Sequence, residues 1–249
     1  TDYTVTTIGN GAFFDNFLTS VTLPNTLTTI GGYAFATNFL TSVALPNTLT
    51  TIGNGAFFGN SLTTVTLPST VITIGDFAFA FASNPLTSVK FLGAVPASFG
   101  FGVFTSGPVV SYYWRYGAPQ TTGGFTTPSW RGYTTEAIAI LTYDTNGGTA
   151  IDPAEIVVGE TATAPVAPTK TDYTFDGWYT ALTGGTAWNF TTDNVTGDMT
   201  LFARYTAVPA TPTGTVLAAT GVALPAIPAG IGAVLLLAGI ALLTRRRRA

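Results

Sequence analysis

A repeat of 22 residues runs through the first part of the chain and limits the folds that it can adopt. Large apolar residues recur at this step in two sets: Ile8, Ile30, Ile52 and Ile74, and Phe13, Phe35, Phe57 and Phe79. Self-similarity at a fixed period of about 20 to 50 residues is typical of solenoids, in which each unit contacts only its neighbours. We therefore expect stacked coils that share one apolar column.

Each repeat predicts two short strands. In the first, residues 18–23, Val21 and Leu23 alternate with Thr22 as the inward and outward residues of a strand do. Pro24 ends this strand because proline cannot donate to a strand ladder. The second strand is residues 27–30, which two glycines follow. One such coil cannot bury enough apolar surface to offset the entropy of ordering its backbone, so the coils must stack.

The repeat IGGYAFATNFLTSVALPNTLTT resembles the bacterial BspA-like form of the leucine-rich repeat, and the resemblance extends over residues 5–133. It implies a mainly β leucine-rich repeat solenoid, with repeats in 1–93 and a capping unit in 94–137. An asparagine recurs with the repeat, at Asn16, Asn38, Asn60 and Asn84. Such a row could bind a ligand, but asparagines in turns commonly hydrogen-bond loop backbone, and we favour that interpretation.

The capping unit is rich in aromatic residues, which include Tyr112, Tyr113, Trp114 and Trp130. We expect these rings to pack over the last open coil, because the terminal units of solenoids must cover an apolar end. The alternative is a sugar-binding platform formed by Tyr116, Trp130, Arg115 and Arg131.

Residues 138–206 change pattern and predict a second, small β module. Asn146-Gly147 between two β-rich runs is a strong hairpin signal. With the segments Pro168-Thr169-Lys170, Gly177-Trp178-Tyr179 and Leu201-Phe202-Ala203, this region resembles the internalin B-repeat, also called the Listeria–Bacteroides repeat. The resemblance implies a β-grasp-like module. Asp144, Asn146 and Asp152 superficially suggest a calcium loop, but we expect a plain turn and no metal site.

The end of the chain predicts an anchor. A Pro/Thr-rich linker, 207–216, precedes an uncharged segment, 222–244, and four arginines. The linker and the uncharged segment are separated by Leu217, Ala218, Ala219, Thr220 and Gly221. This order resembles a cell-wall sorting signal of the LAxTG form in 217–249, with a transmembrane helix in 222–244 and the arginines on the cytoplasmic side.

The sorting-signal resemblance implies two partners, a class E-type sortase and peptidoglycan. The sortase would attack the Thr220 carbonyl and release Gly221, which leaves the protein at the cell surface, covalently attached to the cell wall. The alternative is a single-pass membrane protein with an extracellular N-terminal part. Because the chain begins at Thr1 without a leader, we expect either a removed signal peptide or a fragment.

Composition argues against several functions. The chain has no cysteine and no histidine, which excludes disulfides, zinc sites with those ligands and histidine-based catalysis. Serine and threonine are plentiful but have no neighbouring base, so we expect no enzyme and no cofactor. Ahead of the tail there are five basic and twelve acidic residues, a balance that argues against nucleic-acid binding.

We therefore expect a binding protein, adhesin-like, that uses the solenoid face for a protein or glycan ligand. Outward hydroxyl residues should form a flat uncharged surface: Thr19, Thr22, Thr41, Thr63, Thr66 and Thr87. Phe17 and Phe39 flank it as candidate exposed anchors. One alternative is an ice- or crystal-surface binder that uses the threonine rows, although Ala44 and Lys90 interrupt them. Another is a purely structural wall spacer.

Overall fold

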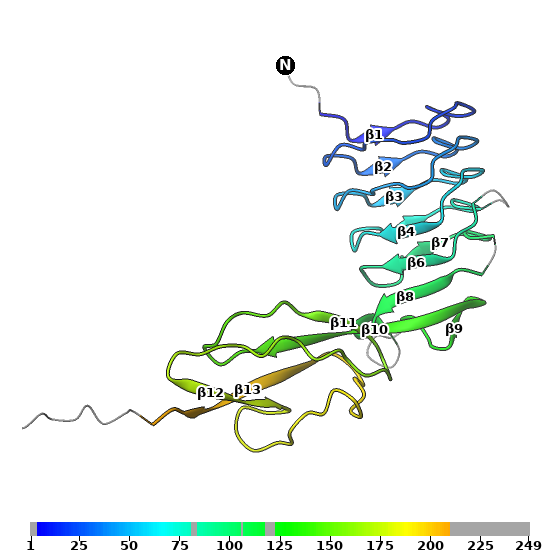
Figure 1. The fold of residues 1–249 in the computed structure, drawn as a ribbon. Helices are drawn as coiled ribbons and strands as arrows, with labels where there is room; N and C mark the ends of the chain where they lie inside the picture. Colours follow the sequence, from blue (N-terminus) through cyan, green and yellow to red (C-terminus); the bar gives the residue numbers. More distant parts are fainter. Residues whose placement is uncertain (1–3, 81–83, 106, 118–122, 210–249) are drawn as a thin grey trace, which may run out of the picture. The chain divides into compact units, whose positions relative to one another are not determined.

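The computed structural model describes residues 4–80, 84–105, 107–117 and 123–209. Within these ranges the chain is built of β-strands and one short 3-10 helix, η1 (Trp114–Tyr116), with no α-helix. Figure 1 shows the strands from β1 to β8 as successive stacked coils, each directly beneath the one before it. The mainly β solenoid that the repeat predicts is confirmed.

One sheet of the solenoid consists of two-residue parallel strands, one from each coil. Its order is β1 (Thr7–Ile8), β2 (Thr29–Ile30), β3 (Thr51–Ile52), β5 (Thr73–Ile74) and β7 (Ser98–Phe99). Equivalent residues pair in register, as Ile8 does with Ile30, because the repeat has a constant length. Hydrogen bonds between coils continue beyond the strands, and the Gly31 N–H donates to the Ile8 carbonyl at 2.8 Å.

A second sheet contains the longer strands. Its order is β12 (Tyr173–Tyr179), β13 (Met199–Ala207), β10 (Tyr133–Asp144), β8 (Val109–Tyr113), β6 (Ser88–Phe91) and β4 (Thr64–Leu67). Two further strands pair with β10: β9 (Ser129–Trp130) and β11 (Ala154–Val157).

The strand predicted in the first half of each repeat forms only from the third coil onward. Residues 18–23 and their equivalents 40–45 are in no strand, whereas Thr64–Leu67 pairs with Ser88–Phe91. Val21 and Val43 are only half-buried, but Val65 and Val89 at the same positions are buried. The packing that holds this segment against the next coil is therefore weaker near the first coil.

The core of the solenoid is a column of stacked phenyl rings. Phe35, Phe57 and Phe79 are fully buried and lie face to face, with centroids 5.4 and 5.2 Å apart. Phe13 continues the column at 5.2 Å from Phe35, but its ring is partly exposed at the first coil. The 22-residue step thus becomes one ring per coil.

Strand β10 joins the solenoid to the small module. Its residues Thr135 to Ile138 pair with β8 in the solenoid sheet, and Leu141 to Asp144 pair with β13. The predicted hairpin is present, because β10 pairs antiparallel with β11 and the intervening Asn146 and Gly147 have φ values of 46° and 80°. The module has its own core around Leu141, Trp178 and Leu201.

The predicted sorting motif, the membrane segment and most of the linker lie in 210–249, outside the described residues. In the ranges that the structure does describe, no helix has the length and apolar character needed to cross a membrane.

Candidate functional site

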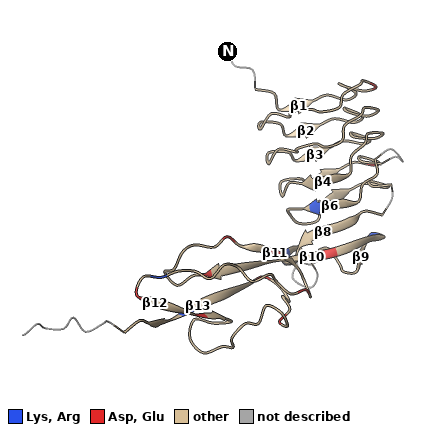
Figure 2. Cartoon of the chain, viewed as in Figure 1, with Lys and Arg blue, Asp and Glu red and all other residues tan. Residues whose placement is uncertain are grey.

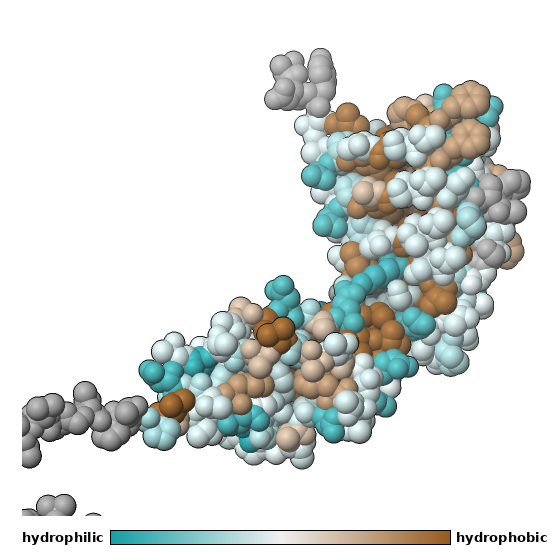
Figure 3. Space-filling view, in the orientation of Figure 1, coloured by the Kyte–Doolittle hydropathy of each residue, from teal (hydrophilic) through white to brown (hydrophobic). Residues whose placement is uncertain are grey.

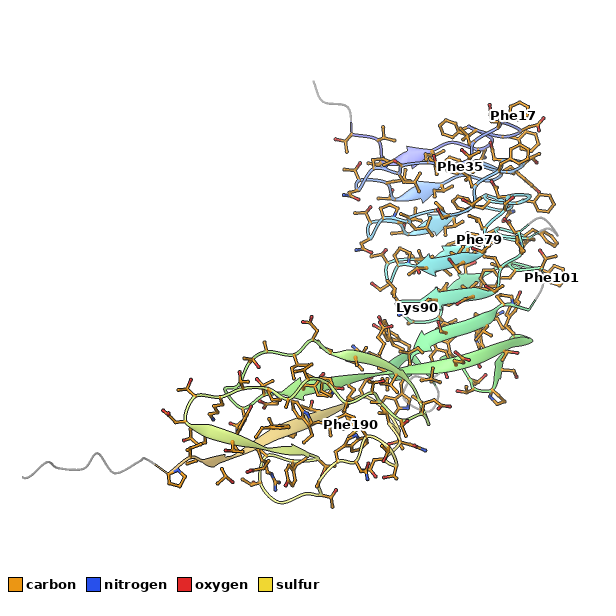
Figure 4. All side chains as sticks on the ribbon, in the orientation of Figure 1. Phe17, Phe35, Phe79, Lys90, Phe101 and Phe190 are labelled. Atoms are coloured by element: carbon orange, nitrogen blue, oxygen red, sulfur yellow. The ribbon has the colours of Figure 1, made fainter. Side chains whose placement is uncertain are left out.

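Two exposed phenyl rings stand at the turn edge, which we define as the stacked turns 10–17, 32–39 and 54–61. Phe17 is 87% exposed and Phe39 is 53% exposed. Their rings are stacked, with centroids 6.2 Å apart and planes 12° from parallel. Figure 4 shows Phe17 at the outer end of the first coil, on the same edge of the solenoid as Phe101. The space-filling view shows aromatic residues gathered at the outer end of the first coils, at the upper right (Figure 3).

A hollow of about 410 Å³ lies beside these rings, and we call it the Phe39 hollow. It exists because the third coil carries Ser61 where the first two carry Phe17 and Phe39, so the outer stack of rings stops at Phe39. The lining residues are Asp15, Asn16, Phe17, Thr37, Asn38, Phe39, Phe58, Gly59, Asn60 and Ser61. The hollow therefore combines aromatic surface with hydroxyl, amide and carboxylate groups.

The asparagine row is structural in the coils where it is enclosed. Asn38 is buried, donates from Nδ2 to the carbonyl of Phe13 at 2.8 Å, and accepts at Oδ1 from the Leu18 N–H at 3.0 Å. Asn60 and Asn84 make the same kinds of contact. These amides hydrogen-bond each turn to the backbone of the coil before it, as expected for turn asparagines.

Each of the six outward threonines is exposed, as the strand pattern predicts: Thr19, Thr22, Thr41, Thr63, Thr66 and Thr87. Ala44 and Lys90 lie at the equivalent outward positions of the second and fourth coils. Figure 2 shows how few charged residues the coils carry apart from Lys90 in β6. The threonine surface is thus polar and almost uncharged, and its role in binding stays a prediction.

Lys90 takes part in a junction between the solenoid and the module. Its Nζ forms an ion pair with Glu155 Oε2 of β11, and Tyr113 of β8 donates to Glu155 Oε1 at 2.7 Å. The hydrogen bond from Lys90 holds the pKa of Glu155 below its usual value, against the opposing effect of burial. Burial, followed by the bond to Glu155, raises the pKa of Tyr113 to about 12. Near neutral pH, Glu155 is therefore ionised and accepts both hydrogen bonds, and the Tyr113 hydroxyl is protonated and donates one.

Two carboxylates of the superficial calcium pattern, those of Glu155 and Asp144, accept hydrogen bonds within the protein. Glu155 is the twelfth residue counted from Asp144, the position at which a calcium loop supplies its glutamate. Its carboxylate faces Lys90 and Tyr113 instead, while Asp144 Oδ1 accepts the Asn146 N–H at 2.9 Å within the hairpin turn. No group of three or more acidic side chains that could hold a metal occurs in the described ranges.

The aromatic residues of the capping unit pack the end of the solenoid. Trp130 is 7% exposed and Tyr112 is 2% exposed, and both contact Phe125 at ring-centroid distances of 4.8 and 4.7 Å. Tyr116 is half-buried. The alternative sugar platform therefore loses its central ring, because Trp130 offers too little open surface for stacking.

Arg131 remains at the surface beside the buried Trp130. Its guanidinium lies over the rings of Phe99 and Trp130, at 5.4 and 5.3 Å from their centroids. A hollow of about 450 Å³, here called the Arg131 hollow, is lined by Phe99, Gly100, Phe101, Gly102, Arg131 and Tyr133. Arg115, the other arginine of the proposed platform, forms an ion pair with Asp198 instead, with Nε and Oδ2 3.0 Å apart.

The repeat spacing predicted the exposed rings but not either hollow. The Phe39 hollow has a sequence signal, since aligning the repeats places Ser61 below Phe17 and Phe39. The Arg131 hollow has none, because its residues come from a coil that follows the readable repeats and from the cap.

Comparison with protein families agrees with the leucine-rich repeat and Listeria–Bacteroides repeat resemblances. The model of the BspA type leucine rich repeat region matches residues 2–106 in 6 copies, and that of the Listeria-Bacteroides repeat domain matches residues 140–204. The chain therefore contains a BspA-type leucine-rich repeat region followed by a Listeria–Bacteroides repeat.

The similar proteins match over short stretches. Internalin H of Listeria monocytogenes is 58% identical over 43 residues, which are 17% of this chain and 8% of that protein. A protein of Evansella cellulosilytica named as a Gly-rich membrane protein is 40% identical over 65 residues, 26% of this chain and 8% of its own length. A second membrane protein by name from that organism is 35% identical over 65 residues, 26% of this chain and 10% of that protein. The matches thus cover a tenth or less of each relative's length.

Proposed function

We propose that the chain is a non-enzymatic, adhesin-like surface protein whose solenoid binds a protein or glycan on another surface. The observation that carries this proposal is the Phe17–Phe39 pair, because two stacked and exposed rings border a 410 Å³ hollow that a ligand could fill. Rings that are 87% and 53% exposed leave unfavourable apolar area in water, which a ligand would cover. The internalin and membrane-protein relatives by name support a place at the cell surface.

Removing both rings should abolish most of the binding. For cells displaying the Phe17→Ala, Phe39→Ala double variant, we expect adhesion to mucin- or gelatin-coated surfaces to fall at least about tenfold, since aromatic anchors dominate binding energy. A matched control removes exposed apolar groups from the module, by Val166→Ala and Leu182→Ala, which are 89% and 46% exposed. Adhesion equal to that of the wild type in the double variant would exclude these two rings as anchors.

We further propose that the end of the chain is a sorting signal, cleaved after Thr220 by a class E-type sortase and linked to peptidoglycan. The support is the sequence order alone: the LAATG motif, the uncharged segment 222–244, and the four terminal arginines. The protein would then be displayed on the wall, with the linker and module between the wall and the solenoid.

The sorting proposal makes a mass prediction. Protein released from cell walls by muramidase should end at Thr220 and carry a peptidoglycan fragment, and Thr220→Ala should shift the protein to the membrane fraction. Released protein that still carries the arginines would contradict sorting and favour the single-pass membrane alternative.

A further inference from the structure

The Arg131 hollow holds a cation that lies over two aromatic rings and has no polar partner among the described residues. Stacking on Phe99 and Trp130 positions the guanidinium through ring contacts, which leave its N–H donors free. Within the part of the chain that the structure describes, no hydrogen bond or ion pair occupies these donors, whereas Arg115, Lys90 and Lys170 each have a polar partner. In an acidic protein body with so few basic residues, a preorganised and unpaired arginine is available to bind an anion.

A free phenyl face borders the same hollow. Phe101 is 77% exposed, and Gly100 and Gly102 on either side of it carry no side chain that could cover the ring. Phe77 lies nearly perpendicular to Phe101, with centroids 5.6 Å apart and planes 82° from parallel, and the high exposure of Phe101 leaves most of its ring open. In Figure 4 the Phe101 side chain lies on the outer edge of the solenoid.

We propose that the Arg131 hollow binds a uronic acid unit of an acidic polysaccharide. A guanidinium presents a planar pair of donors that matches a carboxylate in bidentate fashion. A uronic acid carries its carboxylate directly on a pyranose ring, and the C–H face of that ring stacks on an aromatic face. Arginine and phenylalanine in one 450 Å³ hollow supply both contacts, and this volume is within the usual range of about 300 to 1,000 Å³ for small-molecule sites.

Charge and shape favour this ligand over other anions. The lining contains one cation, which suits a single carboxylate per ring rather than a chain of phosphates or sulfates. An acidic peptide side chain would supply the carboxylate but no flat face for Phe101. Asp76 of the neighbouring coil does not compete for the arginine through its Oδ1, which accepts the Phe101 N–H at 2.7 Å. The hollow shares no lining residue with the Phe39 hollow, so the two sites are separate.

The test compares glucuronic acid with its neutral methyl ester on the full chain, by saturation-transfer NMR titration. We expect the acid to bind about tenfold more tightly than the ester, as a charge-assisted hydrogen-bonded pair requires. Arg131→Gln should remove this preference, and Arg131→Lys should retain only part of it because the planar fork is lost. Phe101→Ala should weaken the acid and the ester alike, since it removes the stacking surface and not the charge.

Controls separate this site from its alternatives. Phe17→Ala should leave glucuronate binding unchanged, and an acetylated tetraglutamate peptide should compete at least about tenfold less well than glucuronate. The proposal is overturned if the ester binds as tightly as the acid, if Arg131→Gln keeps the preference, or if the peptide competes equally. Should Arg131→Gln fail to fold by circular dichroism, the acid–ester comparison on the wild type and the peptide competition still decide.

Discussion

The Phe57→Ala variant is expected to lose about 3–5 kcal/mol of unfolding free energy, the range typical of large aromatic truncations in a core. Phe57 is fully buried and lies between two rings, at 5.4 Å from Phe35 and 5.2 Å from Phe79. Its removal leaves a cavity in the middle of the column and takes stacking contacts from both neighbours. Because each coil is stabilised mainly by the coils next to it, the defect weakens the interfaces on both sides.

The measurement is urea unfolding followed by far-ultraviolet circular dichroism, with Phe17→Ala as the control. Phe17 is the same residue type in the first coil, but it is 87% exposed, so its truncation should change stability by less than about 0.5 kcal/mol. Equal losses in the two variants would show that the ring column does not hold the coils together. A lower m-value for Phe57→Ala would indicate that the coils no longer unfold together.

The repeat made the column and the first sheet predictable because a fixed period leaves no freedom in register. Once Ile8 pairs with Ile30, a constant 22-residue step also brings Phe13 onto Phe35 and Asn16 level with Asn38. Local burial was not predictable in the same way. The first two coils have valine at the same repeat position as the later coils, yet these valines are only half-buried and lie in no strand.

The structure continues the solenoid beyond the last readable repeat. Ser98–Phe99 adds to the first sheet and Val109–Tyr113 to the second, although the 22-residue spacing has ended by Phe91. Backbone pairing needs only extended residues in the right place, so different side chains can continue it. For the same reason β10 runs through residues 137 and 138, where the sequence pattern changes, and pairs with β8 of the solenoid and with β13 of the module.

Both candidate sites arise where the repeat departs from regularity, and for that reason periodicity alone does not predict them. Ser61 ends the outer ring stack and opens the Phe39 hollow. Arg131 and Phe101 are 30 residues apart in the sequence, and they line the same hollow at the end of the solenoid that precedes the module. The sequence identified Phe17, Phe39 and Arg131 individually, but it gave no sign of Phe101, and Trp130 of the alternative sugar platform is only 7% exposed.

The Asn60→Ala variant is expected to lose a similar amount of stability, about 3–5 kcal/mol, through hydrogen bonds and not through packing. Asn60 is fully buried, and its Nδ2 donates to the carbonyls of Phe35 and Phe57 at 2.9 and 3.1 Å. Its Oδ1 accepts from the Leu40 N–H at 3.1 Å. Truncation leaves the Leu40 N–H without a partner, which costs about 1–3 kcal/mol. The Phe35 and Phe57 carbonyls each lose one of two amide donors, since Asn38 and Asn84 still donate to them, and each lost hydrogen bond costs about 0.5–1.5 kcal/mol.

Asn16→Ala provides the matched control, because the same residue type occupies the same repeat position in the first coil. Asn16 is exposed and makes one short-range bond, from Nδ2 to the Phe14 carbonyl at 3.0 Å, so water can replace it and the expected loss is below about 1 kcal/mol. Asn60→Asp should be no better than Asn60→Ala, since a carboxylate keeps the acceptor but removes both donors and buries a charge. If Asn60→Asp were as stable as the wild type, water or backbone rearrangement would be satisfying the carbonyls, and the asparagine row would not be what stitches the coils together.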